Sequence, residues 1–441
     1  MLQKQEEILL KEIWQVRKLI NNIEKYISEL PRFTKKNTPE HTRRFMEYLG
    51  NPQENFKVIH VAGTNGKGSV CAYLNAMLNA QCESTGLFIS PHLVKINERI
   101  VIDNKEISDE DLEKAFDKVM KTVNKMLDEG MPHPAYFEFI YAIGMVAFND
   151  ANIKYAVVET GLGGRLDATN IVKRPYACAI TNIGYDHMYI LGDTIEKIAG
   201  EKAGIIKENV PVFYADSGIE SNSVIENISL KKHAPFYKIG DDKVCVLGIE
   251  DKHIAFSRTS VYDNCNVWKL NNIGSYQPVN AEIAIEIMEF LFKEKGNYEL
   301  WHKVLENLKW PGRMEEVSNG IYVDGAHNIS AVKGFTDTVK SLGGDNIILF
   351  SAVDDKDYES MIKYLCENLS SDLYVITKIE DLRGEGTDIL KNTFERYTDK
   401  PVVVKEDIDS AFEYIESVRN NRNVYCLGSL YLAGMIKRRF M

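Results

Sequence analysis

A glycine-rich turn between a strand and a helix constrains this chain of 441 residues more than any other feature. Residues 57–62 are apolar enough to form a buried strand, and residues 70–78 have the pattern of a helix. The turn between them, residues 63–69, reads Gly-Thr-Asn-Gly-Lys-Gly-Ser. Its glycines let backbone N–H groups point at phosphate oxygens, while the helix N-terminus and Lys67 add positive charge. We therefore predict that residues 63–69 form a phosphate loop in an α/β domain.

The loop departs from the strict P-loop pattern, which would place glycine at position 61 and serine or threonine at position 68. Those positions hold Val61 and Gly68, and the hydroxyl comes one residue later at Ser69. The alternative interpretation is a glycine-rich turn with only a structural role. The preceding strand, the following helix and Lys67 together favour phosphate binding.

Short apolar strands alternate with amphipathic helices along most of the chain, which is typical of a mainly parallel sheet. Further strands of the first part are expected at residues 155–159, 177–182 and 210–215. Helices are expected at residues 109–127 and 277–292. The pattern predicts an α/β architecture in which loops at the carboxyl ends of the strands can form a site.

A change of pattern marks the end of the first domain. Residues 240–270 read as short β segments without helices between them, so we expect a small antiparallel addition there. Beyond Trp-Pro-Gly-Arg at residues 310–313 the alternation restarts, with strands predicted at residues 320–323, 346–351, 372–377, 401–404 and 423–427. We predict an N-terminal P-loop-type domain with a mainly parallel sheet, residues 1–297, and a smaller Rossmann-like α/β domain, residues 298–441, with the linker near residues 298–313.

Composition excludes several classes of protein. Lysine and arginine total 53 against 64 aspartates and glutamates, a net charge of -11, so we expect neither nucleic acid nor a membrane surface as a partner. No segment has the roughly 18 uninterrupted apolar residues that a membrane span requires. The seven cysteines show no CxxC pair or metal-ligand spacing, which is typical of a reducing compartment. We therefore expect a cytoplasmic protein.

Polar side chains follow the strands that we expect next to the phosphate loop. Glu159 ends the strand at residues 155–159, where a nucleotide-bound Mg²⁺ can find a protein oxygen. Taken alone, a glutamate at the end of a strand is more often a capping or solvated residue. His187 follows the next strand and Lys202 lies in a helical segment after it, and such residues usually only pack or face solvent. Their position near Lys67 and Glu159 favours a shared site.

Seven motifs occur in the order and approximate spacing of one family. They are residues 63–69, 88–93, 159–170, 181–187, 201–207, 310–313 and 324–328. Together they resemble the folylpolyglutamate synthase/dihydrofolate synthase family, a branch of the Mur-ligase-like ATP-dependent amide ligases. The resemblance runs from about residue 40 to residues 428–431, which is nearly the whole chain.

The resemblance implies a set of ATP, metal and catalytic residues. It places ATP on Asn65, Gly66, Lys67, Gly68, Ser69, Asn280, Arg313 and Asp324. It places two Mg²⁺ ions near Ser90, Glu159, His187 and Lys202, the second ion bridging ATP and the acyl substrate. Family members often carry a CO₂ adduct on the lysine that matches Lys202, and such a carbamate would supply an oxygen ligand. The implied catalytic residues are Lys67, His187, Lys202 and His327.

The resemblance also implies where the other substrates bind. It places folate against Phe137, Glu138, Leu166, Asp167 and Ala168, and glutamate against His327 and Ser429. Residues 38–44 depart from the family pattern, because enzymes with dihydrofolate synthase activity can show Asp-Leu-Gly near here. Whether dihydropteroate is also a substrate therefore stays open.

The implied reaction adds glutamate to the γ-carboxylate of a reduced folate through an acyl phosphate formed with ATP. Since these substrates are anionic, we expect Lys67, Arg165, Arg313 and bound metal to concentrate positive charge in the cleft of a monomer. Three alternatives remain at this point, namely a Mur-type ligase of cell-wall peptides, a P-loop ATPase or switch protein, and a simple phosphotransferase. Only a folate ligase would release ADP in a manner that depends on both folate and glutamate.

Overall fold

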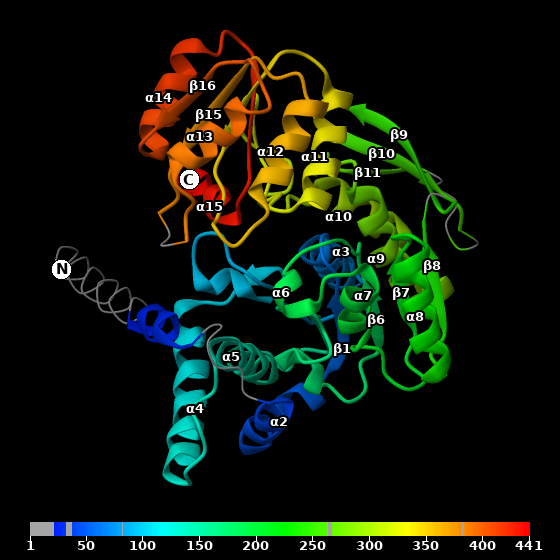
Figure 1. Ribbon diagram of the computed structural model, residues 1–441. Coiled ribbons are helices and arrows are strands. Elements are labelled where there is room, and N and C mark those ends of the chain that lie inside the picture. The colour runs from blue at the N-terminus through cyan, green and yellow to red at the C-terminus, as the bar shows by residue number, and fades with distance from the viewer. Residues whose placement is uncertain are drawn as a thin grey trace, which may run out of the picture.

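The computed structural model describes residues 22–31, 38–81, 83–240, 242–260, 262, 267–380 and 383–441. The described chain forms two α/β units, each built around a mainly parallel sheet, and Figure 1 shows the C-terminal unit stacked on the N-terminal one. The larger sheet has the spatial order β4 (Lys105–Glu106), β3 (Ile100–Ile102), β2 (Thr85–Phe88), β5 (Tyr155–Glu159), β1 (Lys57–Ala62), β6 (Ala177–Ile180), β7 (Val212–Ala215) and β8 (Phe236–Ile239). In this spatial order, neighbouring strands between β2 and β8 pair in parallel. Strands β3 and β4 form an antiparallel edge next to β2.

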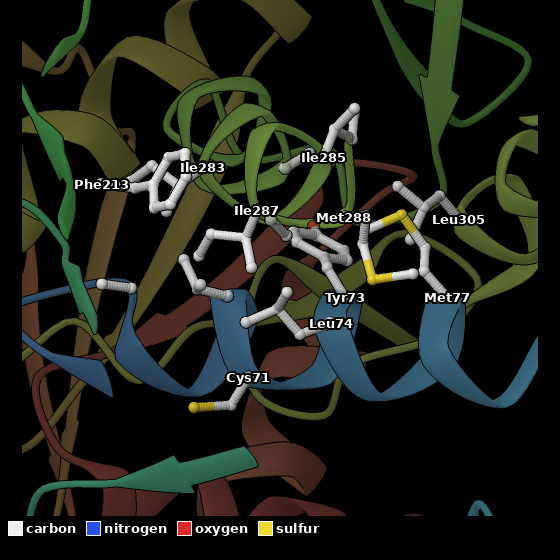
Figure 2. Packing of buried hydrophobic residues seen from close by; sticks show 14 of the residues in the cluster. Cys71, Tyr73, Leu74, Met77, Phe213, Ile283, Ile285, Ile287, Met288 and Leu305 are labelled. Carbon is white, nitrogen blue, oxygen red and sulfur yellow. The ribbon is translucent and has the colours of Figure 1, made fainter. Parts of the chain in front are cut away.

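Helices cover both faces of this sheet. They are α2 (Pro39–Tyr48), α3 (Lys67–Ala80), α4 (Asp109–Asp128), α5 (Tyr136–Asp150), α6 (Met188–Leu191), α7 (Ile195–Ala203), α8 (Ile219–Lys231), α9 (Gln277–Phe292) and α10 (Tyr298–Asn307), with 3₁₀ turns at η1 (Pro52–Glu54), η2 (Ile96–Arg99), η3 (Ala168–Ile171) and η4 (Lys293–Lys295). Figure 2 shows α3 packed against α9 through Leu74, Ile287 and Met288, all fully buried. This packing anchors the helix that begins inside the phosphate loop.

A separate antiparallel sheet packs on the same core. It consists of β9 (Val244–Glu250), β10 (His253–Arg258) and β11 (Val267–Leu270), with β10 in the middle. The antiparallel addition predicted for residues 240–270 is therefore confirmed. Trp268 belongs to the same hydrophobic cluster as Leu74 of α3 and Trp301 of α10.

The C-terminal unit repeats the α/β plan on a smaller scale. Its sheet has the order β12 (Glu315–Ser318), β13 (Ile321–Val323), β17 (Asn423–Leu427), β14 (Asn346–Phe350), β15 (Leu373–Thr377) and β16 (Val402–Lys405). All pairs are parallel except that of the edge strand β12. The helices are α11 (Ile329–Leu342), α12 (Tyr358–Asn368), α13 (Thr387–Glu395), α14 (Ile408–Val418) and α15 (Leu430–Phe440). The predicted fold class is confirmed.

The domain boundary that we predicted at residue 297 remains a prediction. The structure shows that part of the predicted linker is helical. Residues 298–307 of that linker form α10, whose Trp301 and Leu305 are buried in the core of the first unit against α3. The polar and apolar residues of α10 alternate with helical spacing, so the segment can cover a core and still face water. Within the described residues, no helix is both long and apolar enough to cross a membrane.

Candidate active site

A cavity of about 890 Å³ lies between the two units. Many residues of the first unit that line it follow β1, β2, β5 and β6, which lie side by side in the larger sheet. Most residues of the second unit follow β13, β14, β15 and β17 or lie in the helices α11 and α15. Parallel strands end at the same edge of a sheet, so both sheets present their carboxyl-end loops to one space.

Every residue that the sequence placed in the site lines this cavity, except Ser69 and Arg165. Ser69 lies in the first turn of α3 and is fully buried, and its hydroxyl has no hydrogen-bond partner among the described residues. The expectation that Arg165 adds positive charge to the cleft is wrong. Its half-exposed guanidinium pairs instead with Glu201, with 2.7 Å between Nη2 and Oε1, and Arg165 is not among the residues that line the cavity.

The phosphate loop has the conformation that its glycines permit. Gly66 has a φ of 90° in the left-handed region, and a Cβ there would lie 2.3 Å from Oδ1 of Asn280. The Lys67 ammonium donates hydrogen bonds to the carbonyl oxygens of Gly63 at 3.2 Å and Thr64 at 3.1 Å. The ammonium therefore folds back over the loop at the N-terminus of α3, where the helix dipole adds to its positive charge.

Glu159 lies at the end of β5 and is 4% exposed. Its Oε2 accepts a hydrogen bond of 2.9 Å from the backbone N–H of Ser90. Burial raises the pKa of Glu159, although the positive charges of Lys67 and Arg313 act in the opposite direction. A carboxylate beside a serine gives oxygen ligands of the kind that Mg²⁺ prefers. Among the described residues, no group of three or more His, Cys, Asp and Glu side chains is placed to hold a metal ion.

Lys202 of α7 also contacts the phosphate loop. It is 3% exposed, and its Nζ donates a 2.7 Å hydrogen bond to the carbonyl oxygen of Gly63. Burial and the neighbouring charge of Lys67 lower the pKa of Lys202 to about 7. A large share of this amine is therefore neutral near neutral pH, which makes it a nucleophile.

Five side chains from both units meet in what we call the interdomain cluster: Asp186, His187, His327, Asn328 and Lys356. The Asp186 carboxylate accepts hydrogen bonds from the Lys356 ammonium at 2.5 Å and from the Asn328 side-chain amide at 3.0 Å. Although burial raises it, the pKa of Asp186 lies well below its usual range because of its interactions with His327 and Lys356. Burial lowers the pKa of His187 to about 4. His187 is therefore a neutral imidazole that can bind a metal ion.

The residues predicted to hold the nucleotide lie at the junction of the two units. Asp324 follows β13, is 3% exposed and accepts hydrogen bonds from the Tyr276 hydroxyl at 2.6 Å and from the backbone N–H of Met314 at 2.9 Å. Burial raises the pKa of Asp324, and the charge of Arg313 opposes this effect. Asn280 projects from α9 toward Gly66. Asn280, Arg313 and Asp324 therefore line the same cavity as the phosphate loop.

The folate wall, as we call Phe137, Glu138, Leu166, Asp167 and Ala168, lines the cavity in the first unit. Phe137 and Glu138 lie in the first turn of α5, Leu166 and Asp167 lie between β5 and η3, and Ala168 is the first residue of η3. Glu138 and Asp167 are buried, whereas Leu166 is 51% exposed. An apolar surface with two fixed carboxylates is suited to a flat heterocycle that carries N–H donors.

Glu138 is held by helix α2, a contact that the sequence did not reveal. Its Oε1 accepts hydrogen bonds from the Thr42 hydroxyl at 2.5 Å and from His41 Nδ1 at 3.1 Å. His41 Nε2 faces the carbonyl oxygen of Pro132 at 2.9 Å. Both imidazole nitrogens thus face acceptors, which favours the doubly protonated ring. Burial lowers the pKa of His41, but the hydrogen bonds to Glu138 and Pro132 outweigh it and raise the pKa overall.

This pair predicts a pH-dependent contribution to stability. The folded-state pKa of His41 lies above the ~6.5 of an unfolded histidine, so the stabilisation is complete below about pH 6.5 and is lost as pH rises through the raised pKa. Urea unfolding should show that His41→Gln costs more free energy near pH 5.5 than near pH 8.5, by about 1 kcal/mol. Equal costs at both pH values would show that His41 is not charged in the folded protein.

Two residues that line the cavity, Lys356 and Tyr276, were not identified from the sequence. Lys356 comes a few residues after β14, at the carboxyl end of a strand of the second unit. Applying the strand-end argument to the second sheet would have found it. Tyr276 lies just before α9, and only the three-dimensional structure shows that it reaches Asp324.

Comparison with known protein families agrees with this geometry. Residues 61–288 match the Mur ligase middle domain, and residues 312–430 match the glutamate ligase domain of Mur ligases. The fold and the site therefore define the class of protein as a Mur ligase. The chain belongs, within that class, to the folylpolyglutamate synthase/dihydrofolate synthase family.

Individual relatives extend over nearly the whole chain. The dihydrofolate synthase/folylpolyglutamate synthase of Bacillus subtilis is 34% identical over 409 residues, which cover 90% of this chain and 93% of that protein. The crystal structure of Mycobacterium tuberculosis folylpolyglutamate synthase complexed with ADP and AMPPCP superposes with a TM-score of 0.86 at 26% identity, covering 96% of this chain and 99% of that one. The Thermotoga maritima folylpolyglutamate synthase gives 0.81 at 30% identity, covering 96% and 97%.

Proposed function

We propose that this protein is an ATP-dependent amide ligase that adds L-glutamate to the γ-carboxylate of reduced folates. One observation carries the proposal: a single cavity is lined by the phosphate loop, the folate wall and the residues after β13 and β17. The relatives bear the names of folylpolyglutamate and dihydrofolate synthases, and one of them was crystallised with ADP and an ATP analogue. ATP, a folate and glutamate are the substrates that we assign.

The chemistry begins from a poor acyl donor, because a carboxylate repels nucleophiles and would have to expel oxide. In the proposed reaction a carboxylate oxygen attacks the γ-phosphorus of ATP, the bond to the β-γ bridging oxygen breaks, and ADP leaves an acyl phosphate. Lys67 and the N-terminus of α3 neutralise charge on the transferred phosphoryl group. The glutamate amine then attacks the carbonyl carbon, phosphate departs, and the ammonium proton goes to a base.

Mg²⁺ fits the residues around the phosphate loop. Ser90, Glu159 and His187 line the cavity, and the buried Ser69 hydroxyl lacks a hydrogen-bond partner among the described residues. Glu159 would hold the first ion, and His187, kept neutral by burial, would hold a second. When bound, the ions would supply Lewis-acid charge at the phosphate oxygens. Ser69, Ser90 and Glu159 are fixed on α3, on the loop after β2 and on β5.

A carbamate on Lys202 is consistent with its surroundings. The lowered pKa leaves much of the amine neutral, and a neutral amine adds to CO₂ to give a carbamate and one released proton. The product would convert a buried cation beside Lys67 into an anion, which removes the repulsion between two neighbouring ammonium groups. The carbamate oxygens would serve as ligands for the second ion.

The second unit would bind glutamate and accept its proton. His327 Nδ1 faces the carbonyl oxygen of Gly325 at 2.7 Å, so Nδ1 donates and Nε2 is the nitrogen that can accept a proton. Nε2 lies 3.5 Å from Asp186, whose charge would stabilise the imidazolium. Ser429 is buried at the start of α15 and lines the cavity. We assign His327 as the base and Ser429 to the glutamate site.

Dihydropteroate is the second candidate substrate, because the Bacillus subtilis relative is named for both activities. The departure of residues 38–44 from the family pattern argues for polyglutamylation alone. Membership of the folate branch disfavours a cell-wall peptide ligase, a switch protein or a simple phosphotransferase. We further propose that the protein is cytoplasmic and a monomer, and light scattering after size exclusion tests the monomer.

Mass spectrometry of the products tests the function. Tetrahydrofolate or dihydropteroate is incubated separately with ATP and glutamate, and ADP release is followed in parallel. We expect glutamate-sized mass increments on tetrahydrofolate, with ADP release that requires both folate and glutamate. Increments on dihydropteroate would establish the second activity. ADP release without a folate would contradict the proposal.

A further inference from the structure

Three hydrogen bonds fix the carboxylate of Asp167 in the folate wall. Its Oδ1 accepts from the Thr169 hydroxyl at 2.6 Å and from the Thr169 backbone N–H at 3.0 Å. Its Oδ2 accepts from the backbone N–H of Leu162 at 2.9 Å. Thr169 is fully buried and Asp167 is 6% exposed. The orientation of this carboxylate therefore depends on a threonine that does not line the cavity.

The Thr169 hydroxyl has one proton, which it gives to Asp167. It also lies 2.7 Å from Nε2 of His60, so His60 must be the donor in that contact. His60 is thus the tautomer with hydrogen on Nε2, and its Nδ1 has no partner among the described residues. Burial lowers the pKa of His60 to about 3, so the ring remains neutral. The direction of donation is fixed, from His60 through Thr169 to Asp167.

A buried histidine at this position lowers the stability of the fold. His60 is fully buried in the centre of β1, where the neighbouring residues are Ile59 and Val61 and an aliphatic side chain would leave no polar atom unpaired. The same strand leads into the phosphate loop three residues later. The ring therefore joins the strand that holds the phosphate loop to the turn that holds Asp167.

We propose that His60 and Thr169 are positioning residues for folate recognition, holding the Asp167 carboxylate in the orientation that accepts N–H groups of the pterin ring. This inference rests on the proposed function, because it takes the folate wall as the folate site. Two oriented carboxylate oxygens match the paired donors of a pterin, its amino group and ring N–H. The ATP and glutamate sites contain neither residue.

Steady-state kinetics with each substrate varied in turn tests the proposal. Thr169→Val removes the hydroxyl and keeps the volume, and His60→Leu removes the ring donor. Each should raise KM for the folate roughly five- to tenfold while kcat and the KM values for ATP and glutamate change less than about twofold. Thr169→Ser and His60→Gln, which retain a donor, should restore most of the loss. The double variant should resemble Thr169→Val, because His60 acts through Thr169.

Thr377→Val is the matched control, because Thr377 is a fully buried threonine of β15 whose hydroxyl, unlike that of Thr169, has no partner among the described residues. It should leave all three KM values unchanged. Unchanged folate KM in Thr169→Val, equal loss for all substrates, or additive effects in the double variant would each overturn the proposal. If Thr169→Val fails to fold, His60→Leu and His60→Gln decide the question by the same criteria. A wild-type protein without folate-dependent ADP release would instead contradict the proposed function.

Discussion

Replacing Lys67 by alanine should lower folate-dependent ATP turnover by about 10³-fold, because one preorganised charge at a transferring group is commonly worth this much. The Lys67 ammonium is held over the phosphate loop by the carbonyl oxygens of Gly63 and Thr64. The same side chain is partly exposed, so its removal should leave the fold intact.

Coupled detection of ADP gives the rate, and circular dichroism with a thermal melt checks the fold. Lys118→Ala is a suitable control, because its 54% exposed side chain makes only a surface ion pair with Asp150. That variant should keep wild-type turnover. Near-normal turnover in Lys67→Ala would refute the assignment of residues 63–69 as a phosphate loop.

The central strands and the helices packed on them could be predicted from the sequence. The strands expected at residues 57–62 and 155–159 coincide with β1 and β5, and the helix expected at residues 277–292 coincides with α9. These segments are buried on most sides, so their apolar residues are continuous. The strand expected at residues 177–182 ends earlier, at Ile180, and Asn182 forms an isolated bridge with Asn65 of the phosphate loop.

Edge elements were harder to predict, because their patterns are set by contacts distant in sequence. The antiparallel strand β12 is Glu-Glu-Val-Ser, whose polar residues resemble a loop until β13 pairs with it. Helix α10 lies within the predicted linker, and only its packing against α3 explains why Trp301 is buried. The local sequence pattern therefore predicted the central strands and helices of each unit better than the elements at its edges.

The candidate site was predictable where it follows strand ends, and less so where side chains cross between units. The positions of Lys67, Glu159 and His187 follow from neighbouring parallel strands. The pairing of Asp186 with Lys356 across 170 residues does not, because no local pattern encodes it. The prediction for Arg165 failed for the opposite reason. Its place in a motif suggested a role in the cavity, but its side chain pairs with Glu201 and does not line the cavity.

Replacing Lys202 by alanine should lower turnover by roughly 10²- to 10³-fold, and the way it is rescued should identify the working form of the side chain. Truncation leaves space beside Gly63, where the Lys202 ammonium now donates its hydrogen bond. If a carbamate is the active group, a small carboxylate such as acetate replaces its oxygens. If the amine is active, methylamine replaces it.

We expect acetate to restore turnover of Lys202→Ala in a saturable manner and methylamine to have no effect. Lys67→Ala supplies the control for non-specific activation, because a missing cation beside phosphate should not be restored by an added anion. The two lysines both donate to the Gly63 carbonyl, so they share surroundings and differ in the charge that we assign to them. Rescue by methylamine would contradict the carbamate, and it would place two ammonium groups side by side at the phosphate loop.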